Sequence, residues 1–348
     1  MKLTLVVLVL CLACAPEALA SPLEGTALWV AQPSSSLVLA GEAEQAGVRT
    51  LFVKAGDGST PEAAFDSALV GGLREAGLSV CAWTFDYGVH PAAEAQVAVA
   101  AVHAGAQCLV VDAEEAYDGR YGAAQSFVHT LRRALGARFP IGLAGQAEVL
   151  DHPTFPYSVF LAPDGFQVDM PQIYWHELGL SVAGAFQASI GVNSIYGRPI
   201  APVGQLFDGV SLEEVGSFRT AAAEYGTSGF SLFDLESTEP LALAPVLREP
   251  LPDLRLRVVA PTVRPGADGD EVLWAQELLN AAGARLPVGG FFGATTARAV
   301  SRFQSRHHLH VDGLLDGATW SALLRSRRRV REPSWAAHPP LSARPSTS

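Results

Sequence analysis

A short pattern recurs through the first two-thirds of the 348-residue chain and limits the folds open to it more than any other feature. In each copy a helix-like stretch ends at a glycine, and a short apolar run follows directly. The clearest copies have Gly47, Gly77, Gly105 and Gly226 at this point. Glycine is the usual residue just past a helix end, and a continuous apolar run is typical of a strand buried in a parallel sheet. The alternation therefore predicts a parallel α/β fold.

Eight candidate strands follow from this pattern, and their number predicts a closed barrel. Eight strands within about 225 residues, each separated by a helix, match a (β/α)8 TIM barrel over residues 24–247. A doubly wound open sheet is the alternative. No Gly-x-Gly-x-x-Gly motif follows the first strand, which disfavours a dinucleotide site. The predicted strands are residues 27–31, 50–54, 79–83, 108–112, 141–144, 166–170, 200–203 and 229–233.

The fourth predicted strand runs directly into a group of acidic residues. Residues 109–117 read Leu-Val-Val-Asp-Ala-Glu-Glu-Ala-Tyr. On an extended strand Asp112 and Glu114 point to the same side, about 6–7 Å apart along the chain. Two carboxyl groups that face one pocket are what acid-catalysed glycoside cleavage needs, one as proton donor and one as an anion near it. The same residues could instead cap the next helix, and this stretch alone favours neither interpretation.

The other predicted strands also end in polar and aromatic residues. A barrel carries its active site at the carboxyl ends of its strands, so we expect these side chains on one rim. Sugars bind to such a mixture, because aromatic faces stack on their C–H surfaces while carboxylates and amides bond their hydroxyls. An aromatic residue at a strand end can also belong to the core. Beside Asp234, the candidate substrate-binding residues are Lys54, Trp83, Asp86, Gln172, Tyr174, Trp175, Gln205 and Glu236.

Residues 1–20 have the features of a secretory signal. Lys2 gives the positive start, residues 3–13 form an apolar segment, and residues 18–20 read Ala-Leu-Ala, a cleavage site. We expect an exported chain that begins near Ser21 and is periplasmic, wall-associated or extracellular; a lipid anchor at Cys14 is the alternative. No later run of about 20 apolar residues predicts a transmembrane helix. The net charge of −11 argues against a nucleic-acid partner.

The sequence gives no sign of a metal site or another cofactor. Cys81 and Cys108 lie in apolar runs, where we expect buried free thiols, with a disulfide as the alternative. The nine histidines are scattered, and His307 and His308 are far along the chain from the acidic segment, which disfavours a zinc amidase. A Gly-x-Ser-x-Gly turn is absent, which disfavours a serine hydrolase.

A second, smaller domain follows a proline-rich linker. Residues 248–260 have the composition of a linker, and residues 261–325 carry helical periodicity in three segments separated by glycine turns. We expect a three-helix domain, with helices beginning near Glu271, over residues 295–306 and over residues 318–324. The basic and proline-rich residues 326–348 predict a disordered tail.

This second domain resembles the peptidoglycan-binding domain of bacterial cell-wall hydrolases. The resemblance extends over nearly the whole domain and implies binding to the glycan or peptide stems of the wall. The residues that carry it, in order, are Gly269-Asp270-Glu271-Val272, Gln276, Leu279, Gly290-Phe291-Phe292-Gly293, Thr295-Thr296, Ala299-Val300, Phe303-Gln304, Val311-Asp312-Gly313, Thr319-Trp320 and Leu323-Leu324.

The first domain resembles the family 25 glycoside hydrolases, the muramidase type of lysozyme, as a divergent relative. Residues 51–55 are similar to that family's second strand, residues 111–114 to its Asp-x-Glu motif, and residues 233–235 to its acidic position after the last strand. The resemblance implies that Glu114 is the general acid, that Asp112 is an anionic helper, and that Asp234 orients the substrate or stabilises charge.

The chain departs from that family at the first strand. The family carries an aspartate there, whereas residues 28–32 read Leu-Trp-Val-Ala-Gln. Another acid such as Asp86 takes that role, or the barrel has lost activity. Three interpretations therefore remain: an exported hydrolase of peptidoglycan glycan strands, a barrel that binds wall glycan without cutting it, and a hydrolase of another polysaccharide.

Overall fold

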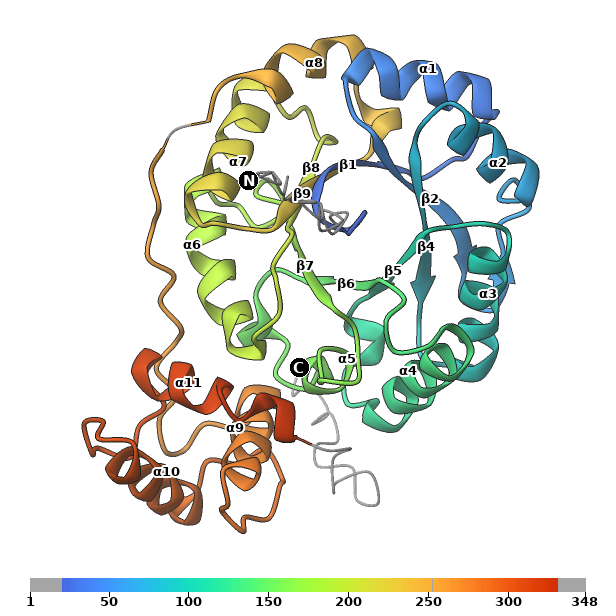
Figure 1. Cartoon of the computed structure of the whole chain (residues 1–348). Coiled ribbons are helices and arrows are strands. Elements are labelled where there is room, and N and C mark those ends of the chain that lie inside the picture. Colours follow the sequence, from blue (N-terminus) through green and yellow to red (C-terminus); the bar gives the residue numbers. More distant parts are fainter. Residues whose placement is uncertain (1–20, 252, 331–348) are drawn as a thin grey trace, which may run out of the picture.

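The protein was described by a computed structural model, in which residues 21–251 and 253–330 are defined. These residues form a barrel surrounded by helices and a small helical domain beside it (Figure 1). The predicted signal segment and most of the predicted tail lie outside the described residues. Within the described part of the chain, none of the helices is long and apolar enough to cross a membrane.

The predicted closed barrel is confirmed. Its parallel strands pair in sequence order, and β1 pairs with both β2 and β9, which closes the sheet and excludes the doubly wound alternative. A short additional strand, β3 (Thr60–Pro61), forms an antiparallel hairpin with β2. The barrel strands are β1 (Gly25–Val30), β2 (Thr50–Asp57), β4 (Ser79–Asp86), β5 (Cys108–Ala113), β6 (Ile141–Gln146), β7 (Val168–Ile173), β8 (Val203–Gln205) and β9 (Gly229–Phe233).

Two strands begin later than predicted. The strand expected over residues 200–203 starts only at Val203, because Ile200 makes just an isolated bridge to Asp169 and Pro199 and Pro202 flank it. Proline cannot donate to a strand ladder, which limits pairing there. The strand expected from residue 166 likewise starts at residue 168.

Helices form the outer ring of the barrel, as Figure 1 shows. At the end of the first helix, Gly47 adopts φ 76° and donates its N–H to Ala43 O, which is the glycine-terminated helix end that the sequence pattern predicts. Gly77, Gly105 and Gly226 also adopt positive φ values, just before β4, β5 and β9. The helices are α1 (Ser36–Ala46), α2 (Ser67–Glu75), α3 (Pro91–His103), α4 (Tyr121–Leu135), α5 (Tyr157–Phe160), α6 (Val182–Asn193), α7 (Leu212–Glu224) and α8 (Pro240–Arg248).

The barrel interior contains a disulfide, so the expectation of free thiols is wrong. Cys81 on β4 and Cys108 on β5 are register partners with a Cα–Cα distance of 4.5 Å, and they form a disulfide across 27 residues of sequence. Both side chains belong to the interior cluster that also contains Trp29, Phe52 and Met170. Parallel pairing of β4 with β5 places the two cysteines in register on the same face of the sheet, a relationship that the sequence spacing alone cannot give.

The C-terminal domain has the three predicted helices, α9 (Asp270–Ala281), α10 (Ala294–Arg306) and α11 (Gly317–Leu324). Two buried glutamines fix the turns between them. The Gln276 side chain accepts from the N–H groups of Gly289 and Gly290 and donates to Phe291 O. Gln304 makes the equivalent bonds at the second turn, accepting from Asp312 N and Gly313 N. A buried amide with all its partners holds a turn tightly.

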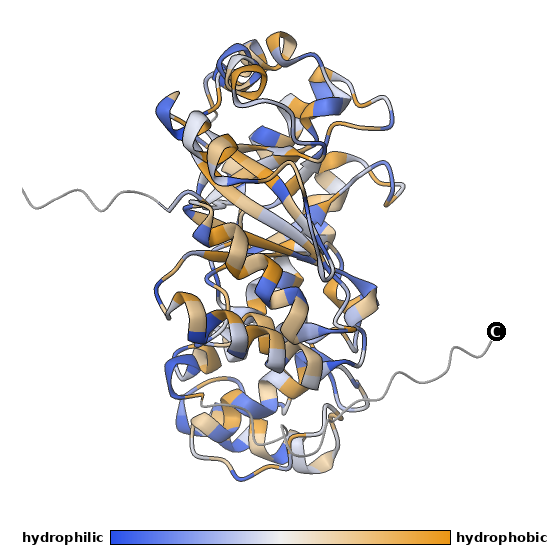
Figure 2. Ribbon diagram, turned by 90° about the vertical axis from the view of Figure 1, so that its right-hand side faces the viewer, coloured by the Kyte–Doolittle hydropathy of each residue, from blue (hydrophilic) through white to orange (hydrophobic). Residues whose placement is uncertain are grey.

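The C-terminal domain is docked on the barrel through α9. Residues 270–279 of this helix are buried on every side. The Asp270 carboxylate accepts from Ser158 N at 2.8 Å, Ser158 Oγ at 2.6 Å and Tyr196 Oη at 2.9 Å, and Trp274 Nε1 donates to Ile195 O. Figure 2 shows the docked domain at one end of an elongated molecule. The sandwiched position explains why this helix is buried on every side, with its polar residues Asp270 and Gln276 as well as its apolar ones.

The first residues of the predicted tail belong to this interface instead. Residues Arg327–Arg329 form a short 3-10 helix, η5, and Arg327 Nη2 donates to Leu161 O of the barrel at 2.8 Å. Val330 is buried. The carbonyl group of Leu161 and the apolar contact hold residues that composition alone assigns to a disordered tail, so the prediction of disorder is wrong for residues 326–330.

Candidate active site

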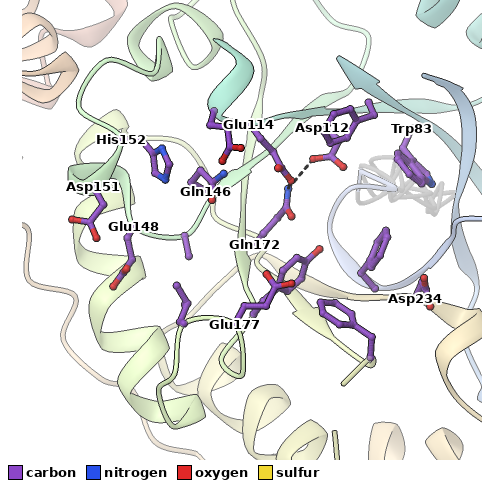
Figure 3. Close-up of a pocket in the computed structure, with 17 residues that line it drawn as sticks. Trp83, Asp112, Glu114, Gln146, Glu148, Asp151, His152, Gln172, Glu177 and Asp234 are labelled. Carbon is purple, nitrogen blue, oxygen red and sulfur yellow. Dashed lines mark hydrogen bonds between the residues drawn. The ribbon is translucent and has the colours of Figure 1, made fainter. Parts of the chain in front are cut away.

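An open cleft of about 640 Å³ lies at the carboxyl ends of the barrel strands. Its inner part is formed by strand-end residues and its outer part by the loops that follow (Figure 3). Among the predicted site residues, the cleft brings together Trp83, Asp112, Glu114, Gln172, Tyr174 and Asp234. The other lining residues are Phe85, Glu115, Gln146, Ala147, Glu148, Asp151, His152, Glu177, Leu178, Phe207 and Phe233.

The centre of the cleft is a pair of carboxyl groups held by one amide. Gln172 Nε2, at the end of β7, donates to Asp112 Oδ1 at 2.7 Å and to Glu114 Oε1 at 3.2 Å (Figure 3). Asp112 is the last residue but one of β5, and Glu114 follows that strand. On the intervening strand, Ala144 stands level with Asp112, and its small side chain leaves room for the amide to reach across.

Both carboxyl groups are in an environment that favours the protonated form. Burial raises the pKa of Asp112 well above its ordinary value, and the negative charge of Glu114 raises it further. Burial also raises the pKa of Glu114, while the hydrogen bond from Gln172 opposes the increase. Two acids this close titrate as a pair. The arrangement can therefore keep a proton at pH values where an exposed carboxyl group has lost its own.

The side of the cleft near Asp234 is aromatic. Trp83 is only 3% exposed and donates its Nε1–H to Val30 O at 3.0 Å, so its ring forms the floor rather than a free stacking surface. Phe233 packs against Trp83 with ring centroids 6.1 Å apart, and Tyr174 packs against Phe233 at 6.3 Å. Asp234 follows β9 and lies across the cleft from Glu114 (Figure 3). An aromatic wall with acids at both ends suits a sugar chain.

Trp175 and Gln205, predicted to bind substrate, lie outside the cleft. Trp175 is buried, packs on Phe218 of α7 and donates to Glu214 Oε1. Successive side chains point in opposite directions after a strand, so Trp175 faces the helices while Tyr174 faces the cleft. Gln205 is fully buried and accepts from His176 N at 2.9 Å, which fixes the loop after β7.

Three further predicted residues also fall outside the cleft lining. Asp86 is fully buried and accepts from Thr84 Oγ1 at 2.7 Å. Glu236 caps the end of β1, because its carboxylate accepts from the N–H groups of residues 31 and 32. Lys54 pairs with Asp57 at 3.1 Å and lies over the Trp83 ring at 5.2 Å, at the edge of the site. These side chains thus bond to the backbone or to neighbouring side chains, although their places at strand ends predict that they bind substrate.

The sequence reasoning missed the outer wall of the cleft, which is acidic. Glu148, Asp151 and His152 come from the loop after β6, and Glu177 from the loop after β7. His152 Nδ1 lies 3.7 Å from Asp118 Oδ2, and this interaction raises the pKa of the histidine. These residues stand two to six positions past a strand end, where neither periodicity nor a motif points to them. Among the described residues, no three side chains group as a metal site.

Comparison with protein families identifies the C-terminal domain. Residues 268–323 match the family model described as "Putative peptidoglycan binding domain". The match covers α9, α10 and nearly all of α11, and it agrees with the resemblance given by the sequence. Comparison with curated proteins returns no match.

Comparison with solved structures supports the fold of the barrel. SleL, the spore cortex-lytic enzyme of Bacillus cereus, has a TM-score of 0.50 and 11% identity over 64% of this chain and 73% of its own, a likeness that shows a shared fold. A peptidoglycan-binding protein from Clostridioides difficile is 36% identical over 19% of this chain and 42% of its own, with a TM-score of 0.19.

An endolysin of the Burkholderia phage AP3 is 43% identical over 19% of this chain and 26% of its own, with a TM-score of 0.19. The chain spans less than half the length of the Clostridioides and Burkholderia phage proteins. The chain thus combines a TIM barrel with a C-terminal domain of the peptidoglycan-binding type.

Proposed function

We propose that the chain is an exported glycosidase that binds peptidoglycan and cleaves its glycan strands by acid catalysis, as a muramidase-type lysozyme does. The observation that carries this proposal is the single amide of Gln172 bonded to both Asp112 and Glu114 in an open cleft. Glycoside hydrolysis uses two carboxyl groups, one of which must hold a proton near neutral pH. The match of the C-terminal domain supports the choice of wall glycan as substrate.

Glu114 is the proton donor in this proposal. It is less buried than Asp112 and faces the open part of the cleft, where the glycosidic oxygen of a bound sugar chain can reach it. When Glu114 gives up its proton, the new negative charge is stabilised by the hydrogen bond from Gln172 Nε2. Asp112 is buried behind it and modulates this transfer through its own charge state.

Asp234 is the third acid of the proposal. It lines the aromatic side of the cleft and orients the sugar or stabilises positive charge at the reacting carbon. No acid from the end of β1 lines the cleft within the described residues, because the chain there reads Ala31-Gln32. The N–H groups of these two residues donate to Glu236. The carboxyl groups that strand ends supply to this cleft are therefore those of Asp112, Glu114 and Asp234.

A barrel that binds wall glycan without cutting it is the second candidate. The observation that favours it is the lack of an acid after β1, at the position where the muramidase family carries an aspartate. In that case the cleft still offers aromatic and polar contacts to a sugar chain, and the carboxyl pair serves recognition. A glycan other than peptidoglycan as the substrate is the remaining alternative.

The deciding experiment is incubation of the chain from Ser21 onward with purified peptidoglycan, followed by mass spectrometry of released fragments. The Glu114→Gln variant is measured beside it. Fragments with new reducing ends, absent with the variant, support a glycosidase, and the identity of the terminal sugar gives the bond cleaved. If both proteins sediment with walls and neither releases fragments, the second candidate holds. Turnover confined to other polysaccharides would exclude peptidoglycan as the substrate.

A further inference from the structure

The outer face of the C-terminal domain carries a groove lined by arginines. The groove has a volume of about 790 Å³ and lies between α10 and the loop after α9. Arg298, Arg302 and Arg306 stand one turn apart along α10, and Arg285 comes from the loop. All four side chains are exposed. No acidic residue lines this groove in the described chain, although the whole protein carries a net charge of −11.

The arginines are not explained by ion pairs within the domain. None of the four forms an ion pair with a described residue. Arg298 makes only a long bond to Thr295 Oγ1 at 3.3 Å, and Arg306 one to Arg302 O at 3.4 Å. Like charges at i and i+4 destabilise a helix by a few tenths of a kcal/mol per pair. A row of three such charges therefore works against helix stability and points to a ligand.

The position of the groove leaves it free for a partner. The first helix, α9, is buried between the domain and the barrel, and α11 contacts η3 (Ser194–Tyr196) of the barrel. Helix α10 lies on the side of the domain that faces away from the barrel (Figure 1). It is consequently the helix of this domain with its outer face open to a large polymer such as a cell wall.

The lining of the groove restricts the ligand further. Between the arginines, Ala284, Leu286 and Ala299 provide a small apolar floor. Successive arginines rise about 6 Å along the helix axis, close to the about 7 Å that two extended residues span. A guanidinium group bonds a carboxylate through two parallel N–H groups. The groove thus fits an extended peptide that alternates methyl side chains with carboxylates.

We propose that this groove binds the peptide stems of peptidoglycan through their carboxylate groups, with Arg298 and Arg302 as the central contacts. Such stems contain alanine, acidic residues and a free C-terminal carboxylate, which matches the floor and the charges. The proposal rests on the proposed wall binding and names the part of the wall that is recognised. The barrel cleft then acts on the glycan, while the C-terminal domain holds the stems attached to it.

The test is a sedimentation assay with insoluble peptidoglycan, using the chain from Ser21 onward with Glu114→Gln present in every protein to prevent cleavage. The test protein adds Arg298→Gln and Arg302→Gln. The control adds Arg325→Gln and Arg328→Gln, two exposed arginines of the same domain that do not line the groove, so the net charge changes equally. We expect the Kd to rise at least about tenfold for the test protein and less than about twofold for the control.

Two chemically treated walls identify the group that is bound. Amidation of the stem carboxylates should reduce binding as strongly as the double substitution, whereas removal of phosphate polymers from the wall should leave it unchanged. A variant with Arg298→Lys and Arg302→Lys keeps both positive charges but lacks the paired N–H groups of the guanidinium. This variant should bind at an intermediate level. Equal binding by test and control proteins, or loss of binding on removal of phosphate, would overturn the proposal. Every protein in this assay carries Glu114→Gln, so the assay measures binding alone. A wild-type protein that fails to cleave peptidoglycan in the separate cleavage experiment would refute the proposed glycosidase and leave the binding proposal standing.

Discussion

The side-chain nitrogen of Gln172 lies 2.7 Å from Asp112 Oδ1 and 3.2 Å from Glu114 Oε1, so one neutral amide holds both central carboxyl groups of the cleft. An amide can donate to two carboxylates but cannot neutralise them. The two acids therefore remain coupled: when one of them is ionised, its negative charge makes the other hold its own proton more tightly. Most of the chemistry proposed for this protein depends on that coupling.

Replacement of Glu114 by glutamine should abolish cleavage of peptidoglycan. The amide keeps the shape of the side chain but has no proton to give to a leaving oxygen, and general acid catalysis contributes about 10²–10⁴-fold to rate. Release of fragments is the measurement. The matched control is Glu115→Gln, since Glu115 also lines the cleft but does not bond to Gln172. Activity of the Glu114 variant within about tenfold of wild type would contradict the role of acid.

The wild-type activity should fall as the pH rises, because the acid form of Glu114 is needed. Burial raises the pKa of Glu114 above 4.5, so the alkaline limb of kcat/KM should lie above that of an exposed glutamate. A profile of initial rates across pH, at constant ionic strength, measures it. An alkaline limb at the ordinary glutamate value would show that the environment of the cleft does not retain the proton.

Replacement of Gln172 by alanine should move that limb to higher pH. Its hydrogen bonds lower the pKa of both Asp112 and Glu114, so their loss raises both values and keeps the proton longer. The maximal rate should fall at the same time, since the new charge on Glu114 loses a donor. Gln146→Ala is the control, because Gln146 lines the same cleft from β6 and, among the described residues, bonds neither acid.

Replacement of Asp270 by alanine should loosen the contact between the two domains. The change leaves two Ser158 groups and the Tyr196 hydroxyl without their acceptor in a buried place, which costs about 3 kcal/mol of unfolding free energy in total. Amide hydrogen exchange should rise at Ser158. The comparison is Asp316→Ala, which removes an N-cap of α11 worth about 1 kcal/mol and should leave exchange at Ser158 unchanged.

The same aspartate should make docking sensitive to pH. Burial raises the pKa of Asp270 to about 6, above the 3.8 of an unperturbed aspartate. A group whose pKa is higher in the folded state contributes stability that is fully present below the unfolded value and is lost as the pH rises through the folded one. Thermal unfolding of the wild type should therefore lose stability between about pH 4 and about pH 6, and Asp270→Ala should flatten that dependence.

Reduction of the disulfide should destabilise the barrel. The bond between Cys81 and Cys108 closes a loop across 27 residues, for which the expected contribution is about 3 kcal/mol. Thermal unfolding with and without reductant, and a mass measurement after thiol alkylation, test this. The Cys81→Ser, Cys108→Ser double variant should melt at the temperature of the reduced wild type. Alkylation of both thiols in native, unreduced protein would contradict the pairing.

The fold was predictable from the chain because its signals are local. Several helices of the barrel end at or beside a left-handed glycine, such as Gly47 and Gly226, and a short apolar strand follows, so the order of elements alone indicates a barrel. The turns of the C-terminal domain were also visible as glycine motifs. The roles of the residues near these turns were not predictable. The role of Gln276, for example, becomes clear only from its bonds to Gly289 and Gly290.

The candidate site was predictable only where the chemistry stands at a strand end. Asp112 and Glu114 follow β5 directly, so the strand rule places them on the rim. Glu236 also follows a strand, yet it is taken by the N–H groups at the end of β1. His152 reaches the cleft from the middle of a loop. Which group a carboxylate bonds to, and where a loop places its side chains, depend on the folded molecule and cannot be predicted from the pattern of one sequence.

The docking of α9 against the barrel has a mechanical consequence. Contacts of α9 fix the distance between the two parts, because Asp270 and Trp274 fasten this helix to Ser158 and Ile195 of the barrel. The C-terminal domain is therefore held at a fixed distance from the barrel cleft and is not joined to it by a flexible tether. Under the proposed function, a protein anchored to the wall by its C-terminal domain would present the barrel cleft to the glycan at one offset from the point of attachment, and the sizes of the released fragments would reflect that offset.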